Sequence, residues 1–276
     1  MSFTMANDAG RAVLADGDDL YDIATVTDGR IGPDPMAAIA ASDELHSISL
    51  ANHEPTGSLA GARLGPPSPR PVNCFGIGLN YRSHIEETGV AGSDVPVVFT
   101  KFPSCISPPH AEVQLVGDSV DYEAELVVVI GKGGRDLPAE AAWDCVAGLT
   151  AGQDISDRAL QFAANPPHFD LGKSRDGYGP IGPVLVSPDS FADYDDIALE
   201  CRVNGEVRQS ATTAQLIHDV PALIAYISAI LTLSPGDLIF TGTPEGVGVA
   251  SGNLLRPGDV IETTLAGIGT MTNRCT

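Results

Sequence analysis

The chain has 276 residues, enough to bury a substantial core in one or two domains. Hydrophobic residues make up 43% of it and charged residues 18%, which are values of globular rather than disordered proteins. Its formal net charge of −21 argues against nucleic acid or an anionic membrane as a partner, because both would repel it.

Residues 1–70 are expected to form a small N-terminal domain. They are rich in Asp, Gly and Ala, with strand-like stretches at 11–15 and 20–26 and a helix candidate at 35–41. The proline-rich run 65–71 cannot continue a helix or a strand, so we expect it to connect this domain to a second one at 71–276.

The second domain reads mainly as strands. Apolar and β-branched runs, two of them launched by Pro-Gly-Asp turns, predict strands at 72–76, 97–99, 113–115, 122–130, 145–151, 184–186, 197–203, 238–240 and 260–265. A helix is predicted after Asp219, which caps it, with Pro221 in its first turn. Because strands do not alternate regularly with helices, the predicted fold class is strand-rich α+β.

Cysteine usage and the N-terminus bear on the compartment. The five cysteines are an odd number without Cys-x-x-Cys spacing, which disfavours a disulfide framework or a zinc site. The N-terminus lacks a basic start followed by an apolar stretch, and the longest nearly apolar window, 220–233, is too short to span a bilayer. These features predict a cytoplasmic protein without a membrane partner.

Two carboxylates in the run 121–130 are the strongest functional signal. Glu123 and Glu125 share one face of the predicted strand, followed there by Val127 and Val129. Because both faces of this strand are apolar, the pair is expected near the core, where two like charges need a cation between them. A divalent metal is the simplest candidate; the alternative is a strand end whose glutamates face water.

Three further segments could supply site residues. His84 and Glu87 are spaced i, i+3, so one helical turn brings a carboxylate beside an imidazole, as a general base requires, although such pairs are also common on helix surfaces. Asp154 follows an apolar strand and is either a third oxygen ligand or a helix cap. Three carboxylates would select Mg²⁺, Mn²⁺ or Ca²⁺ over Zn²⁺. Lys173 lies at the head of the Gly/Pro-rich run 169–183, which reads as an irregular loop of the kind that carries site residues. The alternative is that Lys173 is a solvated surface lysine.

Glycine-rich segments do not indicate nucleotide binding. The stretch beginning at Gly76 and Gly78 has Tyr81 where a dinucleotide loop needs its third glycine. The run 240–248 follows a strand but lacks the Gly-Lys-Ser/Thr ending of a phosphate loop. Its backbone N–H groups and the hydroxyls of Thr241 and Thr243 could instead hold a carboxylate.

Taken together and in order, these motifs resemble the fumarylacetoacetate hydrolase family. The matching segments are Gly78-Leu-Asn-Tyr-x-x-His-x-x-Glu87, Phe99-x-Lys-x-Pro-Ser104, Asp121-Tyr-Glu-x-Glu-Leu126, Asp154-x-Ser156, Gly172-Lys-Ser-x-Asp176 and Gly242-Thr-Pro-x-Gly-Val-Gly248. The resemblance covers roughly residues 72–274. It implies this family's strand-rich catalytic fold, a mixed β-sheet roll, in a homodimer.

The resemblance also implies a role for each matching residue. The metal ligands would be Glu123, Glu125 and Asp154; the water-activating pair on a lid, His84 and Glu87; the charge-stabilising lysine, Lys173; and the substrate contacts, Gly242, Thr243, Lys101 and Gln161. Mg²⁺ or Mn²⁺ would be the cofactor, with Ca²⁺ as a substitute. Leu79, Phe169 and Arg175 depart from the residues usual in relatives, which leaves the substrate open.

The expected activity is metal-dependent hydrolysis of the C3–C4 bond of a small anionic 2,4-dioxo acid, such as an acylpyruvate or fumarylpyruvate. The alternatives are oxaloacetate decarboxylation and isomerisation or hydration of a 2-hydroxy-diene-dioate at the same site. A third alternative is a non-catalytic, acidic metal-binding protein, against which the pairing of His84 with Glu87 argues, because a scaffold needs no general base.

Overall fold

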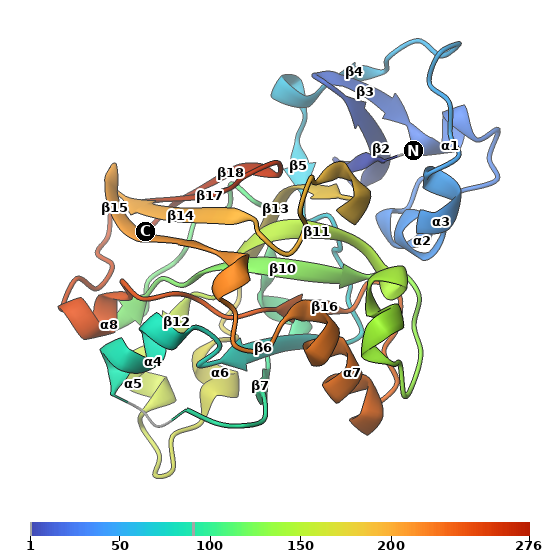
Figure 1. The fold of residues 1–276 in the computed structure, drawn as a ribbon. Coiled ribbons are helices and arrows are strands. Elements are labelled where there is room, and N and C mark those ends of the chain that lie inside the picture. The colour runs from blue at the N-terminus through green and yellow to red at the C-terminus, as the bar shows by residue number, and fades with distance from the viewer. Residues whose placement is uncertain (1, 90–91) are drawn as a thin grey trace.

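A mixed sheet forms the centre of the fold. The computed structural model describes residues 2–89 and 92–276 (Figure 1). In spatial order, the main path of this twelve-stranded sheet is β4 (Gly57–Ser58), β3 (Asp19–Asp22), β2 (Arg11–Asp16), β1 (Thr4–Asp8), β13 (Gly179–Val186), β11 (Val146–Gln153), β10 (Ala124–Ile130), β16 (Leu238–Phe240), β6 (Cys74–Gly78) and β7 (Val97–Thr100). Off this path, β5 (Leu64–Gly65) pairs with β1, and β8 (Ile106–Ser107) pairs with β13.

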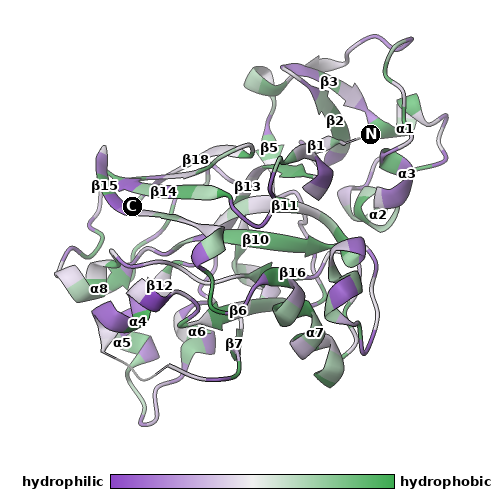
Figure 2. Cartoon of the chain, in the orientation of Figure 1, coloured by the Kyte–Doolittle hydropathy of each residue, from purple (hydrophilic) through white to green (hydrophobic). Residues whose placement is uncertain are grey.

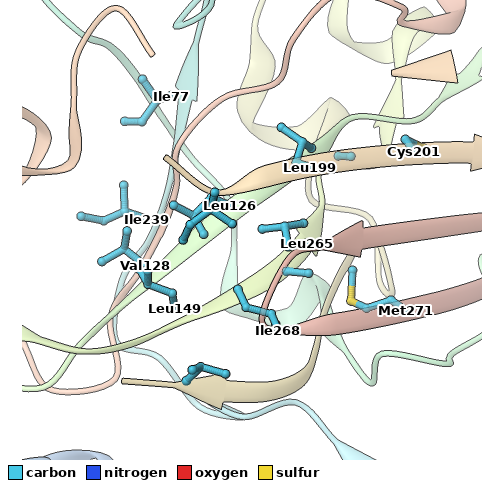
Figure 3. Close-up of a cluster of buried hydrophobic side chains, with 14 of the residues drawn as sticks. Ile77, Leu126, Val128, Leu149, Leu199, Cys201, Ile239, Leu265, Ile268 and Met271 are labelled. Atoms are coloured by element: carbon cyan, nitrogen blue, oxygen red, sulfur yellow. The ribbon is translucent and has the colours of Figure 1, made fainter. Parts of the chain in front are cut away.

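A smaller sheet packs on the large one. Its strands are, in order, β15 (Glu206–Thr212), β14 (Ala198–Val203), β17 (Val260–Leu265) and β18 (Gly269–Arg274), and a separate pair is formed by β12 (Ser156–Asp157) and β9 (Val120–Asp121). Leu126 and Leu149 of the large sheet lie in one buried cluster with Leu199 and Leu265 of the small one (Figure 3). This arrangement confirms the predicted strand-rich α+β class.

The helices are short. They are α1 (Ile23–Val26), α2 (Pro35–Ala40), α3 (Ser42–Leu45), α4 (Arg82–Thr88), α5 (Arg158–Gln161), α6 (Phe169–Gly172), α7 (Val220–Ile230) and α8 (Gly248–Ser251), with 3₁₀ turns at Leu59–Gly61, Pro103–Cys105, Ala139–Cys145, Pro188–Ser190 and Thr213–Gln215. The predicted start of α7 is confirmed, because the Asp219 side chain accepts a hydrogen bond from the amide of Ala222. Across the described ranges, no helix has the length and apolar character needed to cross a bilayer.

Strand β10 lies in the interior of the large sheet, between β11 and β16. Every residue of the strand is buried, and Figure 2 shows most of the strand as hydrophobic. Leu126 and Val128 belong to the core cluster on one face, and Val127 and Val129 to the cluster on the other. Burying one such side chain contributes about 1.5–3 kcal/mol, so both faces of β10 help to hold the sheet in place. The prediction of an apolar strand buried on both faces is confirmed.

Three local predictions were wrong. The second half of 20–26 is not a strand but α1, because the Asp22 carboxylate accepts a hydrogen bond from the Thr25 amide and so caps a helix there. The stretch 113–115 forms no strand; Val113 makes a single bridge to Cys275. The second part of 169–183 is not irregular, because residues from Gly179 onward pair with β11 and β8.

Of the strands in the described ranges, eight were not predicted. Five of them, β4, β5, β8, β9 and β12, are only two residues long, and the three longer ones are β1, β15 and β18. Strands β15 and β18 lie at the two edges of the small sheet and expose most of their side chains, so their sequences carry polar residues instead of an apolar run. Strand β1 is short and mixes Thr, Asn and Asp with two buried apolar residues.

The N-terminal part is joined to the rest by strand pairing. Thr4 and Met5 of β1 pair with Val186 and Leu185 of β13, so the strands of residues 1–70 extend the large sheet. In Figure 1 this part, drawn in blue, stands beside the remaining strands. The division into two domains near residue 70 stays a prediction.

Candidate active site

A cavity of about 410 Å³ collects most of the predicted site residues. Polar side chains on its wall come from α4, α5, the start of β10, the loop after β16 and the segment that follows α6; they are His84, Glu87, Thr88, Glu123, Arg158, Gln161, Lys173 and Thr243. The rest of the wall is formed by Gly78 and by apolar residues: Ile77, Leu79, Phe99, Phe162, Phe169, Val249 and Ala250.

The three predicted metal-ligating carboxylates lie together. Glu123, Glu125 and Asp154 are buried, and one oxygen of each lies within 4.8 Å of the others. Antiparallel pairing of β10 with β11 brings them together, because Ala124 lies opposite Gln153. The Asp154 amide then donates a hydrogen bond to the Glu123 carbonyl at 2.8 Å, which places Asp154 beside the two glutamates.

Lys173 lies between two of these carboxylates. Its Nζ atom is 2.7 Å from Oε2 of Glu123 and 2.7 Å from Oδ2 of Asp154, and it also donates to Oγ of Ser156 at 3.0 Å. All three N–H bonds of the ammonium group therefore have acceptors. Burial by itself would raise the pKa of Glu123, but the positive charges of Lys173 and Arg158 outweigh it and lower the pKa to about 2.

Glu125 has a different environment. It is 1% exposed, and the hydrogen bond that it accepts comes from the Gly242 amide at 2.7 Å. Burial, together with the charges of Asp154 and Glu123, raises the pKa of its carboxyl well above the usual range. A buried carboxylate with two acidic neighbours and, among the described residues, one hydrogen-bond donor fits a hard divalent cation, which would supply positive charge. The donor set, all carboxylate oxygens, thus suits the predicted Mg²⁺ or Mn²⁺.

Lys101 lies behind the carboxylates rather than on the cavity wall. Its ammonium group has no exposed surface and contacts Oδ1 of Asp154 at 2.6 Å and the carbonyls of Lys173 and Tyr178. Burial would lower the pKa of this ammonium, but the adjacent Asp154 carboxylate raises it above its usual value. The predicted contact between Lys101 and substrate stays a prediction; the geometry shows a side chain that positions Asp154.

His84 and Glu87 project from α4, which begins after the Gly78–Tyr81 segment. His84 is buried on the cavity wall, and its Nδ1 atom lies 3.5 Å from Oε2 of Glu87 without hydrogen-bond geometry. The Glu87 carboxylate accepts the Gly246 amide at 3.0 and 3.2 Å. Glu87 therefore ties α4 to the loop after β16, a contact that the sequence did not predict.

The remaining predicted substrate residues lie on or next to the wall. Gln161 and Thr243 line the cavity, whereas Gly242 turns its amide to Glu125. The Thr243 hydroxyl donates to the Ala124 carbonyl at 2.9 Å and accepts from the Gln209 amide group at 2.8 Å. Their roles as substrate contacts stay predictions.

Arg158 and Asp121 are site residues that the sequence reasoning missed. The Arg158 guanidinium donates to Oδ2 of Asp121, to Oε1 of Glu123 at 2.7 Å and to Oε1 of Gln161 at 2.9 Å. Asp121 also accepts the amides of Gly248 and Val249, so one buried carboxylate holds both the arginine and the start of α8. One signal was available: the i, i+3 spacing of Arg158 and Gln161 places both on one helix face.

Comparison with known proteins places this site in a family. Residues 73–276 match the family described as fumarylacetoacetate (FAA) hydrolase C-terminal. Among curated proteins, the human "Oxaloacetate tautomerase FAHD2A, mitochondrial" is 42% identical over 212 residues, which cover 75% of this chain and 68% of the relative. The name of that relative gives a mitochondrial location. The cytoplasmic location of the present chain stays a prediction.

Solved structures agree over nearly the whole chain. One from Mycobacterium smegmatis has a TM-score of 0.93 at 43% identity and covers 99% of both chains. The maleylpyruvate hydrolase from Sphingobium sp. SYK-6, solved in complex with manganese(II) ion and pyruvate, has a TM-score of 0.82 at 30% identity and covers 99% of this chain and 98% of that one.

Proposed function

This chain belongs to the fumarylacetoacetate hydrolase family, and we propose that it is a divalent-metal-dependent hydrolase that cleaves the carbon–carbon bond of a 2,4-dioxo acid. One observation carries the proposal: a histidine with a carboxylate neighbour lines the same cavity as Glu123 and Lys173. The proposed general base and one of the three clustered carboxylates therefore face the same space. The net reaction converts R–CO–CH₂–CO–COO⁻ and water into R–COO⁻, pyruvate and a proton.

Glu123, Glu125 and Asp154 would hold the cation. When bound, a divalent cation supplies Lewis acidity that draws electrons toward the 2-oxo acid as the C3–C4 bond breaks. The maleylpyruvate hydrolase from Sphingobium sp. SYK-6 was solved in complex with manganese(II) ion and pyruvate, which supports the same ligand chemistry here.

His84 is the proposed general base. It would accept a proton from water, and the resulting hydroxide would attack the C4 carbonyl carbon. Its position in α4, which the Glu87–Gly246 contact ties to the loop after β16, keeps the imidazole on the cavity wall. Positioned general bases of this kind contribute about 10²–10⁴-fold in rate.

Lys173 would stabilise the negative charge that develops on the C4 oxygen. Because its three N–H bonds already have acceptors, it acts first through its positive charge. A direct hydrogen bond to the oxyanion requires one acceptor to be released, and Ser156 is the neutral one of the three.

The proposal is tested by turnover of acetylpyruvate and fumarylpyruvate in the presence of Mg²⁺ or Mn²⁺. We expect stoichiometric release of pyruvate and the matching carboxylic acid. If neither compound releases pyruvate although calorimetry confirms metal binding, the hydrolase assignment is refuted.

A second candidate is keto–enol tautomerisation of oxaloacetate, with decarboxylation as a related reaction. It is favoured by the name of the human relative at 42% identity. Tautomerisation needs a proton transfer at C3, for which His84 is also an available base, whereas decarboxylation needs neither that transfer nor an attacking water. Decarboxylation therefore predicts a much smaller dependence on His84 than hydrolysis does.

We further propose that the protein is a homodimer and that Ca²⁺ can substitute for Mg²⁺ or Mn²⁺ in the site. Light scattering of the purified protein would decide the first point. Titration calorimetry with each ion would decide the second.

A further inference from the structure

The charged side chains beside the acidic cluster are buried, whereas the exposed residues of the cavity wall, Phe162, Val249 and Ala250, are all apolar. Glu123 and Lys173 are 5% and 3% exposed, whereas Phe162 and Val249 are 54% and 41% exposed. Exposed residues that line a cavity lie at its mouth. A substrate that places its 2-oxo acid group at the buried carboxylates therefore extends its other end between apolar side chains.

The cations on the wall are already paired with acids. Arg158 contacts Asp121 and Glu123, and Lys173 contacts Glu123 and Asp154. In the described parts of the chain, no other lysine or arginine lines the cavity. A second carboxylate on the substrate would lie among apolar side chains and meet no unpaired cation there.

Leu79 is held on this wall by its backbone. Its φ of +55° lies in the left-handed region, which a leucine seldom adopts. The next residue fixes this turn: the Asn80 side chain donates to the carbonyls of His218 and Thr241 and accepts the His218 amide, and the Asn80 carbonyl accepts the Ile217 amide. The chain thus keeps a large apolar side chain at this point of the cavity.

We infer that the site prefers a 2-oxo acid with a single carboxylate and an apolar group at its far end over the matching dicarboxylate, and that Leu79 is a specificity-determining residue. The inference rests on the proposed function only in placing the 2-oxo acid group at the carboxylates. It separates this chain from an enzyme built for a dicarboxylate such as oxaloacetate.

Binding of two isosteric acids tests the inference. In 5-methyl-2-oxohexanoate, an isopropyl group stands where 2-oxoglutarate has its second carboxylate. Titration calorimetry of the wild-type protein with saturating Mg²⁺ should show at least about tenfold tighter binding of the apolar acid, because burying each CH₂-sized group is worth about fourfold in affinity. Equal binding, or tighter binding of 2-oxoglutarate, would overturn the inference.

Variants that add a positive charge to the cavity wall test which residues determine the preference for the apolar acid. Leu79→Arg should reduce the ratio of the two affinities by at least about tenfold, because it places an unpaired cation on the wall. Val249→Arg, at an exposed position, should shift the ratio in the same direction and decides the matter if Leu79→Arg does not fold. Ile230→Arg adds the same charge at a residue that is 61% exposed and away from the cavity, and should leave the ratio unchanged. An unchanged ratio in both wall variants would refute the role of the wall.

Turnover separates this inference from the proposed function. The matched pair is 7-methyl-2,4-dioxooctanoate and 2,4-dioxoheptanedioate, which differ by the same isopropyl-for-carboxylate exchange. If neither is cleaved while the binding preference holds, the hydrolase proposal fails and the inference stands. If the dicarboxylate is cleaved with the higher kcat/KM, the inference fails and the hydrolase proposal stands.

Discussion

The ammonium group of Lys101 lies 2.6 Å from Oδ1 of Asp154, and neither side chain has any exposed surface. Each charge therefore depends on the other, since water cannot solvate either of them. The same lysine reaches the carbonyl of Lys173, so it also fixes the backbone from which the second lysine extends.

Lys101→Met should destabilise the protein by about 3 kcal/mol, because it leaves a buried carboxylate with one cation fewer. Urea unfolding at pH 7 measures the loss. Lys132→Met is the matched control: its ion pair with Asp43 is exposed, so the change should be about 1 kcal/mol or less. Similar losses in the two variants would contradict the role given to burial.

His84→Ala should lower hydrolysis of acetylpyruvate by about 10²–10⁴-fold, because water loses its general base. Decarboxylation of oxaloacetate by the same variant should fall much less, because it needs no base and no attacking water. Both rates are measured with metal binding confirmed, and His53→Ala serves as a control away from the cavity. Equal losses in both reactions would mean that His84 holds the fold or the lid rather than activating water.

Exhaustive dialysis against EDTA should abolish activity, and Mg²⁺ or Mn²⁺ should restore it, because the three acidic side chains are hard oxygen ligands. Added metal should also raise the Tm of the wild-type protein through binding to the folded state. Glu125→Gln should reduce that shift, since it removes a ligand charge, whereas exposed Glu140→Gln should not. Full activity after dialysis would end the metal assignment.

Glu87→Ala should loosen α4, because it removes the acceptor for the Gly246 amide. Glu87→Gln keeps an acceptor oxygen and should preserve the tether. Hydrogen exchange of the α4 amides should therefore accelerate in the alanine variant and change little in the glutamine variant. Identical exchange in all three proteins would show that this contact does not hold the helix.

Asp22 should stabilise the protein in a pH-dependent way. Burial opposes ionisation, but hydrogen bonds from Thr25 and Arg11 lower the pKa of the Asp22 carboxyl below its usual value. A lowered folded-state pKa means that the stabilisation is present above the unfolded pKa of about 3.9 and is lost as the pH falls through the folded value. Asp22→Ala should cost about 1 kcal/mol at pH 7 through loss of the α1 cap.

Asp22→Asn is the matched control, because it keeps the cap acceptor and removes the charge. The stability difference between the wild-type protein and this variant should be present from pH 5 to 7 and shrink toward pH 3. Chemical unfolding at each pH measures it. A difference that does not vary with pH would exclude a contribution from the charge of Asp22.

The sequence predicted those features that depend on local periodicity. Alternation along the predicted strand 122–130 placed Glu123 and Glu125 on one face, and the i, i+3 spacing placed His84 beside Glu87. These two predictions need only the regular geometry of a strand or a helix. The observed strand β10 begins one residue after Glu123, and the position of Asp154 beside the glutamates depends in addition on the pairing of β10 with β11.

Other features depend on contacts between distant segments, for which no local pattern exists. Asp121 and Gly248 are 127 residues apart, and Glu87 and Gly246 are 159 residues apart, yet both pairs share a hydrogen bond. The position of Lys101 behind Asp154 likewise results from the packing of three loops. Local patterns also failed at α1, where a single capping carboxylate outweighed an apolar run that favours a strand.

The pairing of β1 with β13 has a consequence for the solubility of the chain. Without residues 1–70, the last part of β13, which includes Val184 and Leu185, would become the edge of the large sheet. An exposed edge of apolar residues with unpaired N–H and C=O groups is a template for strand addition from another molecule. The N-terminal strands thus protect this edge of the sheet from self-association.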